Sequence, residues 1–451
     1  MKTNKIDFLR IAITIIFISL FSLSSFSQEE DKWNLSDCVQ WGIDHSLSLQ
    51  LNQNNLKKES ISLDQSKWQL APSVNGWGNG GMDFRRATDQ NNQISSGSSY
   101  TISYGLSASL TLFNGFTALN QISAMKFNLL AWNKKIEQEE NLLYLNILEA
   151  FAKTLMYKEQ IEIASEQLQL SLKEKEKIDE KVKLGLLSNS SLDEINATVS
   201  GNRLAIEKQT NNYKLSLLSL SQLIELPDTV KFELSGDEFN LFVPAEKNYT
   251  QEAIYNEACQ NLPYLREKEY QLEYYKKTLS IKRGQALPNL SISGGYSSAF
   301  YSTDTLSNGN ATPANEQFKN YLNPSLSVKL NIPIFNQRSN EFQIKKSKID
   351  IENAIINLEQ GKKDIYKEIQ SAIQLLNSYY LDYISASDHL VFVKKSYDIY
   401  SEKYSMGLIN STDFITAQNQ LTESKTNVLV AKYNWILQDK IIKLYRGQKE
   451  F

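Results

Sequence analysis

Cysteine and histidine are almost absent from this chain, which has 451 residues and contains two of each. Two cysteines cannot build a disulfide framework or a cysteine-ligated zinc site, and two histidines leave little for a histidine-based metal centre. The formal net charge of −3 offers no positive surface for nucleic acid. Proline is also scarce, with eight residues, although the length alone suggests two or three ordinary domains. The composition therefore argues against disulfide-rich, zinc-binding and nucleic-acid-binding proteins.

Long hydrophobic runs are missing too, except at the N-terminus. Basic residues precede an apolar segment, residues 11–26, and Ser27 stands before the expected cleavage site. This plan predicts a secretory signal peptide over residues 1–27. The alternative is a single membrane anchor, but the run is shorter than the roughly 20 residues that a spanning helix needs. We therefore expect an exported chain whose mature part has no transmembrane helix. The mean hydropathy of −0.39 is compatible with a transmembrane β-barrel, in which only every second residue of a strand faces lipid.

The sequence repeats itself once, at nearly the same separation for three landmarks. The landmarks are QLAP at 69–72 and QALP at 285–288, Phe-Asn at 113–114 and 335–336, and KLGLL at 183–187 and SMGLI at 405–409. Each half therefore has the predicted order helix, strand, loop, strand, very long helix, break, helix. We assign residues 28–226 to the first repeat, 227–249 to a linker and 250–451 to the second repeat.

Four segments have the alternation of one-sided strands. Between residues 100 and 112, the even positions are Tyr, Ile, Tyr, Leu, Ala, Leu and Leu, and the odd positions are mostly Ser and Thr. Strands are predicted at about 73–84, 99–113, 288–301 and 321–335. Each is at least as long as the about 9–11 residues that a bilayer-crossing strand needs.

Four strands are too few for a closed barrel, because single-chain barrels start at about eight strands. An open sheet edge is prohibitive in lipid, so transmembrane strands would require several chains to share one barrel. The polar connections at 85–98 and 302–319 are expected to be unstructured, outward-facing loops. The alternative is a soluble, half-buried sheet.

The predicted helices are too long for a compact globule. Residues 116–184 contain neither Pro nor Gly, and residues 338–406 contain only Gly361. About 70 helical residues would span on the order of 100 Å. A shorter helix follows Gly185 and another follows Gly407, each with apolar residues at alternating steps of three and four. This period is typical of helices that supercoil on their neighbours, so two long antiparallel hairpins are predicted.

These features together resemble the TolC-like outer-membrane efflux proteins, over essentially the whole mature chain. The most specific local match is Tyr404-Ser405-Met406-Gly407, followed by Asp413. The resemblance implies a mainly helical protein with four strands per chain, and a homotrimer that forms a 12-stranded outer-membrane β-barrel continued by a periplasmic α-barrel. It also implies a periplasmic adaptor and an inner-membrane pump as partners.

By the same resemblance, Asp413 would belong to a carboxylate ring at the periplasmic entrance and Tyr404 to the contacts that close it. Three such carboxylates around an axis would attract cations. The alternative for Asp413 is a solvated carboxylate near the positive end of a helix dipole, and the alternative for Tyr404 is plain packing.

The chain departs from the family pattern at three positions of this entrance. Thr416 replaces a second aspartate, Ile409 replaces an arginine, and Ser191 is the first-half counterpart of Asp413. Glu194, one helical turn after Ser191, offers a carboxylate in its place, although a solvated helix position is the alternative there too. With these three departures, the chain lacks residues for the salt bridges that close the entrance in the family.

No constellation of residues supports catalysis, and no cofactor is expected. A G-x-G-x-x-G match at 76–81 lacks the preceding strand and following helix that a dinucleotide site needs. The predicted function is a passive exit duct in the outer membrane that carries substrates from the adaptor and pump to the exterior. The alternative is a non-transporting periplasmic coiled-coil protein, either an adaptor or a structural spacer.

Overall fold

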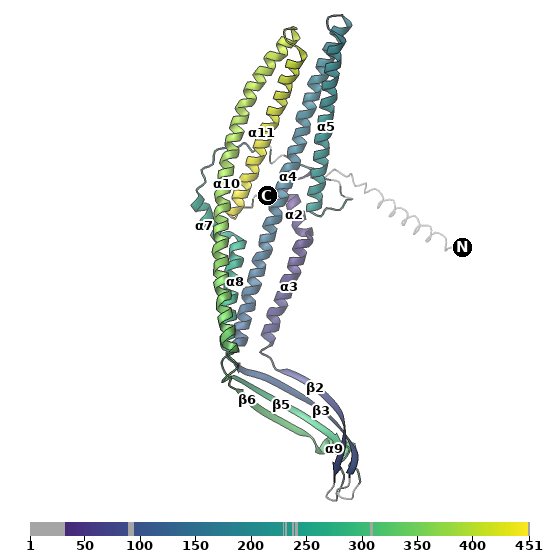
Figure 1. Ribbon diagram of the computed structural model, residues 1–451, viewed down its shortest axis with the longest axis vertical. Helices are drawn as coiled ribbons and strands as arrows, with labels where there is room; N and C mark the ends of the chain where they lie inside the picture. Colours follow the sequence, from purple (N-terminus) through teal and green to yellow (C-terminus); the bar gives the residue numbers. More distant parts are fainter. Residues whose placement is uncertain are drawn as a thin grey trace, which may run out of the picture.

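The structure is a computed structural model that describes residues 32–88, 94–228, 232–236, 242–306 and 310–449, together with residues 230 and 239. Helices extend over most of its length, and a four-stranded sheet lies at one end (Figure 1). The elements of the first half are β1 (Lys32–Trp33), α2 (Leu35–His45), α3 (Leu47–Trp68), β2 (Ser73–Thr88), β3 (Ile94–Asn114), α4 (Thr117–Lys183) and α5 (Asn189–Leu223). The elements that follow are β4 (Glu233–Leu234), α7 (Gln251–Asn261), α8 (Pro263–Gly284), β5 (Asn289–Tyr301), α9 (Ala314–Asn320), β6 (Asn323–Asn331), α10 (Ser339–Ser405) and α11 (Ser411–Tyr445).

The two halves repeat the same order of elements. Two helices precede a pair of strands in each half, and a helical hairpin follows. The long helices α4 and α10 both have 67 residues, and their partners α5 and α11 both have 35. The predicted fold, mainly helical with four sheet strands in two tandem repeats, is confirmed.

The predictions for the connections between strands are wrong in part. Backbone pairing in the first hairpin continues as far as Thr88 and Ile94, so most of the predicted loop at 85–98 is strand. The predicted loop at 302–319 contains most of helix α9, which ends at Asn320. Gln317 fixes this helix beside β5, because its buried amide accepts from the Tyr301 N–H at 2.8 Å and donates to the Thr312 carbonyl at 2.9 Å. β6 ends at Asn331, four residues before the predicted end at 335.

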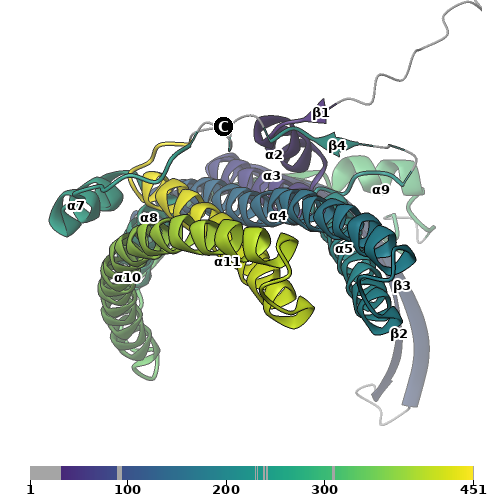
Figure 2. The ribbon, with the colours of Figure 1, turned by 90° about the horizontal axis from the view of Figure 1, so that it is seen from above.

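Two helices run the whole length of the helical part, and shorter helices fill the space beside them. α4 packs against α5 and α11 on the side of the hairpin turns, and against α3 and α8 toward the sheet. α10 packs against α11 and then α8. Thus α8 continues the position of α11 along the layer, and α3 continues the position of α5 (Figure 1). Seen along the long axis, these helices follow a curved line, with α2 and α9 on its convex side (Figure 2).

The sheet has the strand order β2-β3-β5-β6 and is antiparallel throughout. Its register places apolar side chains opposite one another on one face, as with Leu106 and Tyr296. On the other face small polar side chains meet, and the hydroxyls of Ser293 and Ser327 lie 2.8 Å apart. The apolar face is open to solvent in the single chain, with exposed fractions of 60% for Leu106, 76% for Leu326, 63% for Val328 and 59% for Leu330. α9 packs on this apolar face, where Phe318 contacts Tyr104 and Phe300.

The hydrophobic core lies midway along the helices, where α2, α7 and the segment between the halves cover α4, α10 and α11. Leu148, Phe239 and Ile369 are fully buried there. A capping box between Asn34 and Asp37 starts α2 by satisfying backbone N–H groups of its first turn. This core fixes the two hairpins to one body, so both turns lie at the same end, away from the sheet (Figure 1).

None of the described helices is both long and apolar enough to cross a membrane. Over the described ranges, no three His, Cys, Asp or Glu side chains gather into a possible metal-binding group. Cys38 is buried and Cys259 half-buried, and both are free thiols.

Candidate gate at the hairpin tips

Both hairpins turn through the same glycine-capped motif. Gly185 has a φ of +73° and Gly407 a φ of +76°, values that favour glycine because it lacks a Cβ. In the first hairpin the Leu186 N–H donates to the Lys181 carbonyl at 2.8 Å, and the Gly185 N–H donates to the Val182 carbonyl at 3.0 Å. The second hairpin repeats both bonds. These two bonds define a Schellman motif, which satisfies the last carbonyls of a helix and ends it.

Asp413 lies in the first turn of α11, at the tip of the second hairpin. Its N–H donates to Oδ1 of the N-cap residue Asn410 at 2.8 Å, and its carboxylate is exposed near the positive end of the helix dipole. Thr416, one turn later, is also exposed, and its hydroxyl donates to the Thr412 carbonyl at 2.8 Å. Thr416 therefore adds no charge beside Asp413.

Tyr404 closes the second hairpin by packing on α11. Its ring stacks on Phe414 with centroids 4.7 Å apart and planes 5° from parallel. Burial raises the pKa of Tyr404 to about 12, and the negative charges of Glu174 and Glu194 add to the rise. The hydroxyl therefore stays neutral well above physiological pH, and Tyr404 acts at the tip as a neutral aromatic side chain.

Two hydrogen bonds join the first hairpin to the second at their tips. The Ser411 hydroxyl donates to the carboxylate of Glu194, which links the start of α11 to α5. Lys181 at the end of α4 donates from Nζ to the Ser405 carbonyl at the end of α10, at 3.4 Å. Glu194 is exposed to solvent and also accepts this hydrogen bond. It ties the two hairpin tips of one chain together.

Below the tips, the seam between α11 and α4 buries polar side chains. The Thr422 hydroxyl donates to Oε1 of Gln167 at 2.8 Å. Nε2 of Gln167 and both amide atoms of Gln418 are buried without a hydrogen-bond partner. Since a buried polar atom without a partner costs about 1–3 kcal/mol, this seam is less stable than an apolar seam of the same shape.

We expect Gln418→Met to stabilise the protein, because it removes an unpaired amide from a site that is 0% exposed while keeping a similar volume. The expected gain is about 1–3 kcal/mol in the free energy of unfolding, measured by chemical denaturation at fixed protein concentration. Gln438→Met is the matched control. Gln438 is also buried, but its Nε2 donates to the Ala372 carbonyl at 3.2 Å, so its replacement should destabilise. A loss of stability in Gln418→Met would contradict the assignment of the unpaired amide.

All six residues predicted for the gate lie in the hairpin turns or within two helical turns of them, namely Gly185, Glu194, Tyr404, Gly407, Asp413 and Thr416. Their roles in gating stay predictions. Sequence reasoning missed the roles of Lys181, Ser405 and Ser411 in the hydrogen bonds between the hairpin tips. The apolar period predicted for the helix after Gly407 includes Phe414, and that pattern was the available signal for the partner of Tyr404.

A curved layer of long helical hairpins that continues into a sheet with one apolar face is the fold typical of outer-membrane channels. Solved structures share this fold. The crystal structure of CusC superimposes with a TM-score of 0.78 at 17% identity, over 91% of each chain. The Campylobacter jejuni CmeC outer membrane channel gives 0.75 at 16% identity, over 94% of this chain and 87% of that one. VceC from Vibrio cholerae gives 0.74 at 13% identity, over 92% and 96%.

The sequence comparisons give the family. The cation efflux system protein CusC of Escherichia coli O157:H7 is 22% identical over 396 residues, which cover 85% of this chain and 80% of CusC. The profile of the outer membrane efflux proteins matches residues 43–224 and 254–445, one segment in each half. The chain belongs to the outer membrane efflux protein family. It is a channel protein of the outer membrane with a periplasmic helical extension, as its sequence predicted.

Proposed function

We propose that three copies of this chain form a passive exit duct, which receives substrates from a periplasmic adaptor and an inner-membrane pump. One observation carries the proposal. The four-stranded sheet has an apolar, exposed face and two unpaired edges, β2 and β6. In lipid such edges must pair, because no water is present to satisfy their N–H and C=O groups. Pairing of β6 with β2 of the next copy closes a barrel, and it also keeps the antiparallel alternation of the strands.

The orientation of the sheet's apolar face relative to the helical layer supports a duct with a water-filled interior. α9 packs on the apolar face of the sheet and lies on the convex side of the helical layer (Figure 2). The apolar residues therefore face outward, toward lipid, and the polar face, with pairs such as Ser293 and Ser327, faces the concave side. A duct built from three such layers has a hydrated lumen.

The helical layer also has two unpartnered edges. α3 and α5 lie at one edge and α10 at the other, and both edges expose large apolar side chains at helical spacing. Those on α3 and α5 are Leu47, Leu51, Ile61, Trp68, Leu204 and Leu215, and those on α10 are Phe342, Ile349, Ile356, Leu381, Phe392 and Ile399. Rows of large exposed apolar side chains favour an interaction site, and contact between the two edges of neighbouring copies would bury them.

In this proposal the inner-membrane pump and its adaptor determine which substrates the duct carries. The duct would bring no energy source of its own, and its opening would require the hairpins to separate, a two-state change biased by the adaptor. Purification of the chain from its native membrane at low detergent should bring the adaptor and pump with it. Recovery of the assembled trimer without either partner, under conditions that preserve such complexes, would reject the tripartite assignment.

We expect Asp413→Asn to weaken the block of conductance by divalent cations. Three copies of the exposed Asp413 carboxylate would meet around the axis at the entrance and bind a divalent cation, as rings of carboxylates do in cation channels. The measurement is the divalent concentration that halves single-channel conductance, and it should rise about tenfold or more. Asp382→Asn is the control, since Asp382 is an exposed aspartate of α10 remote from the tip. An unchanged block in Asp413→Asn would reject the ring.

A further inference from the structure

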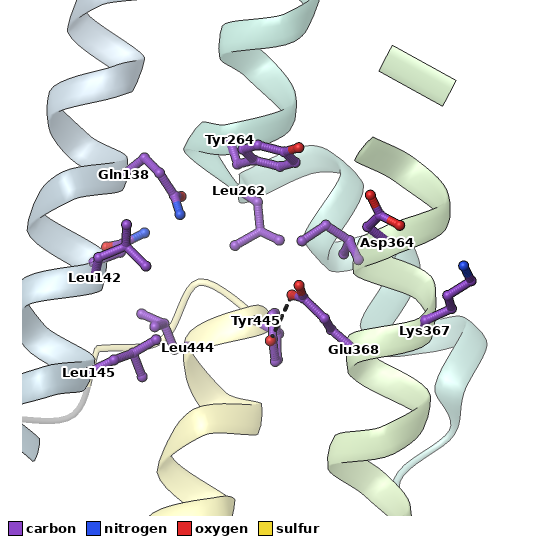
Figure 3. Close-up of a pocket in the computed structure, with 12 residues that line it drawn as sticks. Gln138, Leu142, Leu145, Leu262, Tyr264, Asp364, Lys367, Glu368, Leu444 and Tyr445 are labelled. Atoms are coloured by element: carbon purple, nitrogen blue, oxygen red, sulfur yellow. Dashed lines mark hydrogen bonds between the residues drawn. The ribbon is translucent and has the colours of Figure 1, made fainter. Parts of the chain in front are cut away.

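A cavity of about 530 Å³ lies where α11 ends and α8 begins, between α4 and α10. It results from the stacking of two separate helices in one position of the layer, where neither helix fills the gap between their ends. Leu142 and Leu145 of α4, Leu444 at the end of α11, and Leu262 just before α8 supply an apolar wall (Figure 3). The volume is within the roughly 300–1,000 Å³ of small-molecule sites.

Three side chains of this cavity offer acceptor oxygens to a ligand. Asn141 is only 7% exposed, lines the cavity, and its Oδ1 has no hydrogen-bond partner. Glu368 accepts from the Tyr445 hydroxyl at 3.0 Å through Oε2 (Figure 3). Asp364, one turn before Glu368, accepts from the Gln360 side chain through Oδ1 at 2.8 Å. Each carboxylate therefore keeps one oxygen outside these bonds on the α10 wall, and the unpaired amide oxygen of Asn141 lies on the α4 wall.

The tyrosine hydroxyls of the cavity remain neutral. Burial raises the pKa of Tyr445, and the charge of Glu368 and its hydrogen bond add to the rise. Burial is also the main cause of the raised pKa of Tyr264, followed by the charge of Asp364. The cation Lys367 extends away from the centre of the cavity (Figure 3). The lining thus carries two carboxylates and one cation, which leaves the cavity with an excess of negative charge.

We propose that this cavity binds a small amphipathic organic cation. The protonated amine would donate to Glu368 and Asp364 of α10, a second polar hydrogen of the ligand would reach Asn141 of α4, and the apolar body would lie against the leucines. The ligand supplies the donor that the buried Oδ1 of Asn141 lacks, and its positive charge complements the carboxylates. An anion would meet two carboxylates against the single lining cation Lys367. The site lies in the middle of the helical part, far along the chain from the hairpin tips, and it is independent of the gate.

The test is equilibrium binding of rhodamine 6G, a monocationic dye, to the assembled protein in lipid nanodiscs, followed by fluorescence polarisation. Glu368→Gln should weaken binding about tenfold or more, since it removes a charge-assisted hydrogen bond. Glu359→Gln is the matched control, an exposed glutamate on the same helix that does not line the cavity. Leu145→Trp, which fills the apolar side, should abolish binding. Fluorescein, an anionic dye of similar ring size, should not bind.

Three results would overturn the proposal: no saturable binding of rhodamine 6G, equal binding of fluorescein, or equal weakening by Glu368→Gln and Glu359→Gln. Conductance of the same samples in a planar bilayer separates this inference from the proposed function. A conducting protein that does not bind the dye rejects the cation site and leaves the duct in place.

Discussion

Replacement of Gly115 by alanine is expected to remove the assembled protein from the outer membrane. Gly115 lies in the turn from β3 into α4, with a φ of +64°, and a Cβ there would stand 2.1 Å from the Gly284 carbonyl oxygen. That oxygen belongs to the backbone at the end of α8, so it cannot move aside as a flexible side chain would. The contact joins the two repeats at the boundary between the helical part and the sheet.

The energetic cost of this change combines two terms. A non-glycine residue in the left-handed region costs about 1–3 kcal/mol, and the backbone clash adds to it. Total stabilities are commonly only about 5–15 kcal/mol, so we expect loss of the heat-modifiable trimer from membrane fractions. Gly201→Ala is the control. Gly201 is exposed within α5 and a Cβ there meets nothing within 4 Å in the single chain, so alanine should stabilise the chain by up to about 1 kcal/mol. Normal amounts of Gly115→Ala trimer would contradict the described turn.

An arginine in place of Leu106 is expected to prevent insertion into the membrane. Leu106 lies on the apolar face of β3, is 60% exposed in the single chain, and stands opposite Tyr296 of β5. On the lipid face of a barrel, arginine near the bilayer midplane costs about 2–4 kcal/mol per copy, and each trimer would carry three copies. The measurement is the fraction of the protein in outer-membrane vesicles that is resistant to alkaline extraction.

Ser107→Arg supplies the matched control for this prediction. Ser107 is the next residue of the same strand and points to the polar face, opposite Gly295. Its arginine would enter the hydrated lumen, so insertion should remain and conductance should fall. If both variants insert equally well, the two faces do not differ in their exposure to lipid, and the assignment of Leu106 to the lipid face is wrong.

Much of the fold was predictable because its signals are local. The absence of Pro and Gly over residues 116–184 indicated α4, and Gly185 and Gly407 marked the hairpin turns, because a single glycine residue at positive φ ends each long helix. Strand alternation indicated which residues of β3 share a face. The end of β2 was missed because strand pairing beyond residue 84 depends on backbone hydrogen bonds, which its Arg, Ala and Thr residues do not signal.

The parts that sequence reasoning missed depend on contacts between distant residues. Gln317 holds α9 beside Tyr301 through a hydrogen bond. A helix of seven residues is too short to show a helical period in its sequence. Glu194 and Ser411 are 217 residues apart, so their hydrogen bond follows only from the packing of the two repeats. The cavity beside Glu368 likewise forms only where the ends of α11 and α8 meet, so the sequence of neither helix alone signals it.

Single-channel recording in a planar lipid bilayer tests the central claim most directly. Purified protein that migrates as a heat-modifiable trimer should produce stepwise ionic conductance when added to one side of the bilayer. The steps should be of uniform size, because each is one three-chain duct with a fixed lumen. Stable protein that stays monomeric in aqueous buffer and produces no conductance would contradict the account.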